Sequence, residues 1–433
     1  MSITILIKIL FTIYCLATLS FFQPFNIVGA EVAKAVSYTA MVAILFLAIS
    51  QSSESMVRHQ SRFGAPLRSL LFFIGISIFM PTISFFDQSL SATFVATIPY
   101  FSYSLYLALR KFGIEKSFFY RLIFAITTTA VVTHLINLYT FPLISFGVPE
   151  DEYEFERGGV RLTIIGFNFV IVAFLIALTK FKEKRSKRWL LLLAVCYTVI
   201  LFSYTRQHIA VCSLFIFIML MSIIKRKLIR FTIALALIAS SIFIVPKITL
   251  FQQLIKLTLE QRERNEYANR ENVRISAAKY YGYEAFKTPY NRVFGNGVPS
   301  YHSKWGDEIK RYADTEHVYM ADVGWFGFYW QFGLFAVLSM GIICCMAIFP
   351  KKQHSLLGKY YFAWLMITSL INGALLYQYE IVVTIIVMCI IDYENEHTIK
   401  VVRPVKRVVR KNFWASLYDW RKVRREQKIL ERR

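Results

Sequence analysis

Residues 324–349 read GWFGFYWQFGLFAVLSMGIICCMAIF, a run of 26 residues without a charged side chain. A helix that crosses the hydrocarbon core of a bilayer needs about 20 predominantly apolar residues. The run therefore predicts a transmembrane helix. Stretches of similar character occur along most of the chain and bring the number of predicted spans to twelve, at residues 3–22, 32–50, 69–86, 91–109, 118–146, 162–179, 189–204, 208–224, 231–249, 324–349, 359–376 and 378–391.

The composition agrees with a membrane protein and excludes several soluble classes. Hydrophobic residues make up 56% of the 433 residues and charged residues only 18%, whereas soluble domains average about 25% charged residues. The formal net charge of +23 would suit a nucleic-acid-binding protein, but 39 Phe and 25 Tyr residues do not. A disordered chain and a small disulfide-linked domain are excluded as well. We therefore expect an all-α polytopic membrane protein that binds no nucleic acid.

The positions of the basic residues explain most of the net charge. Lys and Arg are retained on the cytoplasmic side in the short connections between spans. Thirty-four of the 50 Lys and Arg residues are Lys8 or lie in alternate connections and in the C-terminal tail, at residues 51–68, 110–121, 180–188, 225–230, 351–359 and 393–433. This alternation predicts that both termini are cytoplasmic. Apolar residues at helical spacing beside many Lys and Arg in the tail predict a helix on anionic membrane lipid, and the alternative is a solvated segment that only fixes the topology.

One connection is much longer than the others. Residues 250–323 form a polar segment of 74 residues with eleven basic and ten acidic residues, so its charge is close to neutral. Long loops cross a membrane largely regardless of charge, and this one falls on the outer, periplasmic side. Its aromatic residues, its glycine turns and a predicted helix near 270–287 indicate a folded loop. The chain thus divides into transmembrane helices one to nine (1–249), the large loop (250–323), transmembrane helices ten to twelve (324–392) and a basic tail (393–433).

Three arginines on the outer side are candidates for binding an anionic group. Arg206 lies in a tight turn between two apolar spans, where the positive-inside tendency would not place it. Arg161 stands at the start of span six, and Arg274 lies four residues after Arg270 on a predicted helix face. The simpler interpretation makes Arg206 an interfacial side chain, pairs Arg161 with nearby carboxylates and leaves Arg274 in water.

Two short segments of the large loop carry the other candidates. Residues 291–308, NRVFGNGVPSYHSKWGDE, combine a glycine turn with aromatic rings on which sugar rings can stack, and the sugar-binding candidates are Gly295, Gly297, Tyr301 and Trp305. Residues 314–327, DTEHVYMADVGWFG, place His317 and Asp322 where the loop meets the membrane. His and carboxylates are the usual general bases, so either residue is a catalytic candidate. The alternative is a solvated interfacial segment.

This arrangement resembles the superfamily of O-antigen polymerases and O-antigen ligases. The resemblance rests on about twelve spans, on one large outer loop before the last three of them, and on the three arginines together with the Gly-x-Gly turn. The ligase branch is associated with a His followed by Asn, Ser or Gln, whereas His317 is followed by Val318. Gly333 has the expected spacing from Asp322, but the flanking residues differ from the ligase pattern. The polymerase branch is therefore favoured.

The resemblance implies a GT-C-like glycosyltransferase of the bacterial inner membrane. It implies a glycan donor on undecaprenyl diphosphate, transfer to a sugar hydroxyl of a lipid-linked repeat unit, and a chain-length regulator protein as partner. Arginines would stabilise the diphosphate leaving group, so we expect no cofactor and no metal site. Two alternatives stay open: a ligase that transfers the glycan to a lipid A-core sugar, and a transporter or flippase of lipid-linked oligosaccharides.

Overall fold

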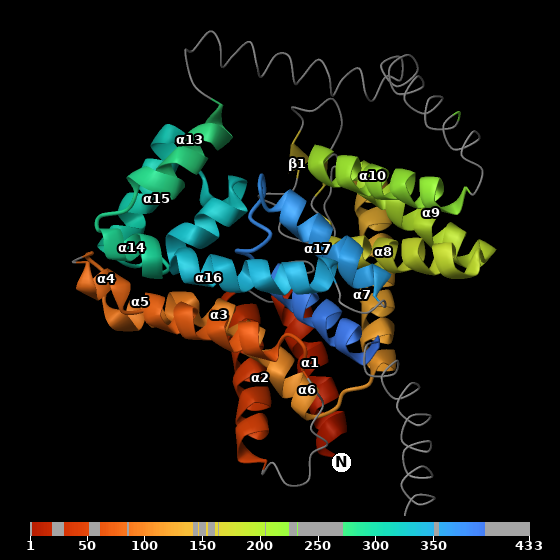
Figure 1. Cartoon of the computed structure of the whole chain (residues 1–433), viewed down its shortest axis with the longest axis horizontal. Coiled ribbons are helices and arrows are strands. Elements are labelled where there is room, and N and C mark those ends of the chain that lie inside the picture. Colours follow the sequence, from red (N-terminus) through yellow and green to blue (C-terminus); the bar gives the residue numbers. More distant parts are fainter. Residues whose placement is uncertain are drawn as a thin grey trace, which may run out of the picture.

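A computed structural model describes residues 2–19, 30–51, 61–84, 86–141, 146, 153–154, 161–162, 164–203, 205–224, 232, 272–349 and 355–394 of the chain. Its elements, drawn in Figure 1, are α1 (Ile3–Thr18), α2 (Ala30–Ser50), α3 (Gly64–Ser77), α4 (Met80–Ile83), α5 (Leu90–Thr97), the 3-10 helix η3 (Ile98–Tyr103), α6 (Ser104–Lys111), α7 (Lys116–Thr140), β1 (Tyr153–Glu154), β2 (Arg161–Leu162), α8 (Phe167–Lys184), α9 (Lys187–Phe202), α10 (Arg206–Ile223), α13 (Val273–Lys279), the π-helix η7 (Tyr280–Glu284), α14 (Pro289–Phe294), α15 (Lys304–Glu316), the 3-10 helix η8 (Met320–Asp322), α16 (Gly324–Ile348) and α17 (Leu356–Thr368). A further helix covers residues 378–394. Almost all of the predicted span at 231–249, the first part of the large loop and almost all of the basic tail lie outside the described residues.

The prediction of a helical membrane protein is confirmed. Apart from the short antiparallel pair of β1 and β2, the elements of the described residues are helices. Six helical stretches of these residues are long and apolar enough to cross a membrane, namely Glu31–Ser50, Gly64–Ile83, Leu90–Lys111, Lys116–Thr140, Arg206–Ile223 and Gly324–Ile348. The number of twelve spans and the GT-C-like fold remain predictions.

Several predicted boundaries differ from the structure, most clearly those of the sixth and eleventh apolar stretches. The sixth apolar stretch forms a helix only from Phe167, because Gly166 adopts a left-handed conformation with φ of 73° and caps α8. The eleventh ends as a helix at Thr368, and the chain then turns through residues 369–377 before the last helix starts. The connection between the last two apolar stretches is therefore longer than the sequence suggests.

Two helices form the centre of the bundle. Every residue of α8 from Asn168 to Thr179 is buried, and so is every residue from Glu380 to Tyr393 in the helix 378–394. A helix that is apolar on all sides needs neighbours on all sides. For α8 these neighbours are α7, α9, α10 and α17 (Figure 1).

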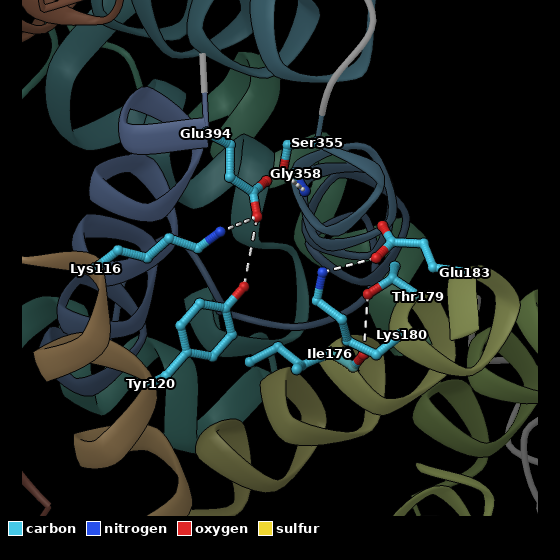
Figure 2. A network of polar contacts seen from close by, with 9 residues as sticks. All are labelled: Lys116, Tyr120, Ile176, Thr179, Lys180, Glu183, Ser355, Gly358 and Glu394. Carbon is cyan, nitrogen blue, oxygen red and sulfur yellow. Dashed lines mark hydrogen bonds and ion pairs between the residues drawn. The ribbon is translucent and has the colours of Figure 1, made fainter. Parts of the chain in front are cut away.

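Polar contacts fix one end of the bundle, which we name the Asp392 end. Arg110 and Asp392 form an ion pair with 3.5 Å between Nε and Oδ2, and both side chains are at most 3% exposed. Figure 2 shows Glu394 beside this end, where its carboxylate accepts a hydrogen bond from Nζ of Lys116 at 2.6 Å. The same view contains the first turn of α17 and the last turns of α8. Connections that the sequence predicts to be basic thus meet at one end of the molecule.

α16 is broken in its middle at Gly333, whose φ of 79° and ψ of 179° are not helical. In an unbroken helix the carbonyl groups of Trp330 and Gln331 would bind the amides four residues later. Here they accept hydrogen bonds from the amides of Asn296 (2.8 Å) and Gly297 (2.9 Å) instead. The Gly-x-Gly turn of the large loop therefore satisfies the backbone groups that the break leaves open, as backbone at membrane depth requires.

The described part of the large loop packs in a small hydrophobic core, to which Phe86 and Trp330 contribute from outside the loop. Its buried residues are Phe86, Ala277, Tyr281, Trp305, Val318, Val323 and Trp330. Figure 1 shows α13, α14 and α15 gathered at one end of α16. Gln88 fastens this unit to the bundle, because its Oε1 accepts from the amide of Ser300 (2.8 Å) and its Nε2 donates to the carbonyl of Val298 (2.8 Å). The large loop is therefore docked on the helices.

Candidate functional site

Asp322 is the last residue of η8 and lies at the end of the bundle opposite to Asp392. Both α16 and the helix 378–394 begin beside η8 and run to the Asp392 end. Glycines allow the connection after α17 to pack against this turn. A Cβ atom on Gly324 would overlap the carbonyl oxygen of Asn372, and one on Gly373 would lie 3.1 Å from Cα of Ala321. The backbone around Asp322 is thus held from two sides.

Arg274 of α13 and Tyr377 of the connection after α17 are electrostatic neighbours of Asp322. Partial burial raises the pKa of Asp322 above its ordinary value, and the positive charge of Arg274 lowers it in part. Burial is also the main cause of a raised pKa of Tyr377, to which the charge of Asp322 contributes. A carboxylate whose pKa is raised towards neutral pH is a better proton acceptor than a fully solvated one.

Two more tyrosines and a glutamine extend the site towards the break in α16. Tyr301 is 69% exposed and lies within electrostatic reach of Tyr377 and Tyr100. The hydroxyl of Tyr100 interacts with the side chain of Gln331, two residues before Gly333. Oε1 of Gln331 is buried and has no hydrogen-bond partner in the described part of the chain. We name as the tyrosine cluster the residues Tyr100, Tyr301, Asp322, Gln331 and Tyr377.

The structure separates the two predicted base candidates. His317 is the C-cap of α15 and has a left-handed conformation with φ of 56°. It lines a cavity of about 270 Å³ formed by α13, η7 and α15, whereas Asp322 lies with the tyrosine cluster. Asp322 is therefore the candidate that the structure brings together with Arg274.

Three predicted sugar-binding residues have structural roles in the fold. Trp305 is only 4% exposed, and its ring stacks on Phe86 with 4.4 Å between the ring centroids. Gly295 and Gly297 are buried and have φ values of 83° and 82°. The turn lies so close to the backbone of α16 and α3 that a Cβ atom on either glycine would overlap a carbonyl oxygen, of Gln331 or Ser77. Both positions therefore need a residue without a side chain. The glycine turn and the tryptophan therefore build the fold, and Tyr301 alone of the four candidates is open to a sugar.

The other two arginines lie on different elements from Arg274. Arg161 belongs to β2, pairs with Glu154 of β1 in the strand register and lies on a strand that contacts α7. Arg206 is the first residue of α10, which packs against α8, α9 and α17. Its neighbour His208 is buried, and the His208 ring lies 5.5 Å from the ring centroid of Trp364. The sequence pattern indicated neither the strand nor this aromatic contact.

Sequence reasoning missed three members of the tyrosine cluster, namely Tyr100, Gln331 and Tyr377. One signal was present for Tyr377, because the segment YQYE (377–380) is a polar interruption between the last two apolar stretches. Nothing in the sequence marks Tyr100 or Gln331, since each lies inside a predicted span. Among the described residues, no group of three or more His, Cys, Asp or Glu side chains is arranged to hold a metal ion.

The chemistry of this arrangement is that of a hydroxyl-binding site with a proton acceptor. Phenol, amide and carboxylate groups form hydrogen bonds with sugar hydroxyls, and Asp322 can accept a proton. Arg274 supplies a positive charge that favours an anionic group. Comparison with protein-family models gives no match for this chain, and a search of curated proteins gives no match either. The function is therefore inferred from the site itself.

Proposed function

We propose that the protein is a membrane glycosyltransferase of the O-antigen polymerase type, which extends a polysaccharide from lipid-linked repeat units. The observation that carries the proposal is the position of Asp322. Its half-buried carboxyl group lies within the electrostatic influence of Arg274 and Tyr377, on a turn where a docked loop meets two apolar helices. A lipid-linked substrate needs such a place, because its sugar is polar while its polyprenyl chain stays in the bilayer.

In the proposed reaction Asp322 accepts the proton of the acceptor hydroxyl. The hydroxyl oxygen forms the new glycosidic bond as the bond between the donor sugar carbon and the phosphate oxygen breaks. The electron pair of that bond leaves with the lipid diphosphate, whose growing negative charge Arg161, Arg206 and Arg274 stabilise. Charge-assisted hydrogen bonds of this kind contribute roughly 1.5–3 kcal/mol each.

The proposed location follows from the charge distribution. The Asp392 end carries basic connections and faces the cytoplasm, whereas the Asp322 end faces the periplasm at the bacterial inner membrane. Undecaprenyl-diphosphate-linked oligosaccharide is the substrate, and a chain-length regulator protein is a partner. The departure of Val318 from the ligase pattern supports a polymerase over a ligase.

Polysaccharide profiles of cells that lack the gene test this proposal. Complementation with the wild-type chain should restore a ladder of long products. With Asp322→Asn, the molecule that normally receives the finished polysaccharide should carry single repeat units only. Loss of a polymerase and loss of a ligase differ in this assay. Without a ligase, long chains still form but remain on the lipid diphosphate. Accumulation of long lipid-linked chains would therefore favour the ligase and contradict the proposal.

A transporter of lipid-linked oligosaccharides is the second candidate, and two observations favour it. Transporters use broken helices and ionisable residues within the membrane, and α16 is broken at Gly333. Glu380, in the first turn of the helix 378–394, is only 4% exposed, and its Oε2 has no hydrogen-bond partner among the residues that the structure describes. A buried carboxyl group without a cation is expected to be protonated, and a proton-coupled transporter requires it to ionise.

Substitution of Glu380 separates the two candidates. The side chain of Glu380→Gln is neutral and of nearly the same shape as the protonated acid, so a polymerase should keep its activity. A proton-coupled transporter should lose its activity, because glutamine cannot release a proton. Movement of a fluorescent lipid-linked sugar across reconstituted vesicles, measured beside polymer formation, decides between the two.

A further inference from the structure

The cavity that contains His317 combines features of a carbohydrate-binding site. It lies between α13, η7 and α15, has a volume of about 270 Å³, and is lined among others by Ser276, Tyr280, Glu284, Tyr312, Glu316 and His317. Ligand pockets in proteins usually span about 300–1,000 Å³. A cavity just below this range suits one small ring rather than a long chain.

A stacked aromatic pair forms one wall of the cavity. The rings of Tyr280 and Tyr312 are 4.3 Å apart with an interplanar angle of 19°. Burial, the neighbouring Tyr312 and Glu284 raise the pKa of Tyr280 to about 12, so its phenol stays a hydrogen-bond donor at neutral pH. Tyr312 is 38% exposed and has Glu316 and Glu284 as electrostatic neighbours. Aromatic surface beside hydrogen-bonding groups is the combination that binds the two sides of a sugar ring.

The charges of the cavity narrow the class of ligand. Among the described residues, Glu284 and Glu316 form no ion pair, so their carboxylates can accept hydrogen bonds from a ligand. Among the described residues that line the cavity, Lys279 is the only Lys or Arg, so these residues carry a formal net charge of −1 when His317 is neutral. This charge disfavours acidic sugars and suits neutral or amino sugars.

The backbone of His317 supports a role in binding. His317 is one of two non-glycine residues with positive φ in the described part of the chain, the other being Arg185. A left-handed conformation costs a non-glycine residue about 1–2 kcal/mol, and such costs are concentrated at functional sites. A glycine at this C-cap position would avoid the cost. A ligand contact made by the imidazole of His317, which lines the cavity, would explain why this position has a histidine.

We propose that this cavity is a second sugar-binding subsite, which holds one neutral or amino sugar of the polysaccharide away from the reacting bond at Asp322. His317 then contacts bound sugar as a binding residue, and Asp322 alone acts as the base. The identity of the ligand as part of a polysaccharide rests on the proposed function, but the cavity and its chemistry do not. A subsite of this kind would keep the growing chain in place between successive transfers.

Direct binding to the full-length protein in lipid nanodiscs tests the proposal. The probes are glucose, N-acetylglucosamine, glucosamine and glucuronate, observed by saturation-transfer NMR. We expect saturable binding of at least one neutral or amino sugar. Glucuronate should bind at least about tenfold more weakly than that sugar. Tyr312→Ala should weaken the binding by a similar factor, whereas Tyr312→Phe keeps the stacked ring and should bind more tightly than Tyr312→Ala.

The control is Tyr290→Ala, which removes a tyrosine that is 70% exposed on α14 and does not line the cavity. It should leave sugar binding unchanged. Absence of saturable binding to the wild type, equal binding by Tyr312→Ala, or glucuronate binding as tight as that of the neutral and amino sugars would each overturn the proposal. Sugar binding without any polymer formation would contradict the proposed function alone. Polymer formation with unaltered binding in Tyr312→Ala would contradict the subsite alone.

Discussion

Gly295 and Gly333 face each other at the break of α16, and both have a positive φ, of 83° and 79°, with an extended ψ. A Cβ atom on Gly333 would lie 2.5 Å from the amide nitrogen of Gly295, and one on Gly295 would overlap the carbonyl group of Gln331. This close approach brings the Gly-x-Gly turn to the open carbonyl groups of α16. The docking of the large loop, and with it the position of Asp322, depends on these two residues.

Gly333→Ala should therefore destabilise the protein. With φ of 79° and ψ of 179°, Gly333 has a backbone conformation that is essentially restricted to glycine and costs another residue about 1–3 kcal/mol. Overlap of the alanine Cβ with the carbonyl oxygen of Val293 adds to that cost. Gly341→Ala in the same helix is the matched control, because nothing lies within 4 Å of its Cβ position. Thermal unfolding in detergent should show a lower Tm for Gly333→Ala and an unchanged or higher Tm for Gly341→Ala. Equal Tm values for the two variants would contradict the observed break.

The base assignment predicts a pH dependence that can be shifted by Arg274. Activity should fall at low pH as Asp322 becomes protonated, and Asp322→Asn should lose about 10²- to 10⁴-fold in rate. Arg274 favours the ionised form of Asp322, so Arg274→Ala raises the pKa of Asp322 and moves the acid limb of the profile to higher pH.

Lys310→Ala is the control for this shift, because it removes an exposed positive charge from α15 on the same unit. Its acid limb should stay at the wild-type pH. A profile that is the same in Arg274→Ala and the wild type would show that Arg274 does not act on the base.

Arg206 should be required for long products. Loss of one charge-assisted hydrogen bond to the diphosphate should lower the rate roughly 10- to 150-fold, while the amount of protein in the membrane stays the same. Arg206→Lys retains a point charge but not the planar fork, so intermediate activity is expected. Arg121→Ala, in the first turns of α7, is the control and should give normal product. Normal chain length in Arg206→Ala would exclude the role in anion binding.

The ion pair at the Asp392 end should contribute to stability rather than to activity. Asp392→Ala leaves the charge of Arg110 buried without its carboxylate, and such a change costs about 3–5 kcal/mol. Glu183→Ala breaks an exposed pair with Lys180 at 2.7 Å and should cost less than about 1 kcal/mol. Chemical unfolding of the two variants compares these values. A similar small effect for both would show that the Asp392 pair does not fix this end of the bundle.

The apolar stretches could be located from the sequence because each is long and bounded by charge. α2, α9 and α10, for example, begin and end within about two residues of the predicted limits. The break in α16 could not be located, because glycine at 333 looks the same in sequence as glycine at 341, which lies within the helix. Only the approach of Gly295 from a distant segment distinguishes the two.

The site was predicted in part for the same physical reason. Asp322, Arg274 and Tyr301 could be proposed from the sequence because charged and aromatic residues in an outer loop stand out against an apolar chain. Trp305 was proposed to bind sugar, but it is buried and stacks on Phe86, because the same pattern of aromatic residues can also build a small buried core. Tyr377 could not be assigned, because its electrostatic interaction with Asp322 joins segments that are 55 residues apart.

The most direct test of the proposed function is the product formed by the purified protein in liposomes that contain a synthetic repeat unit on undecaprenyl diphosphate. The proposal predicts a ladder of polymerised, lipid-linked products with the wild type, and no polymer with Asp322→Asn at equal protein content. Failure of the wild type to polymerise any of a panel of such units, with transfer of the fluorescent lipid-linked sugar across the vesicle membrane instead, would contradict it.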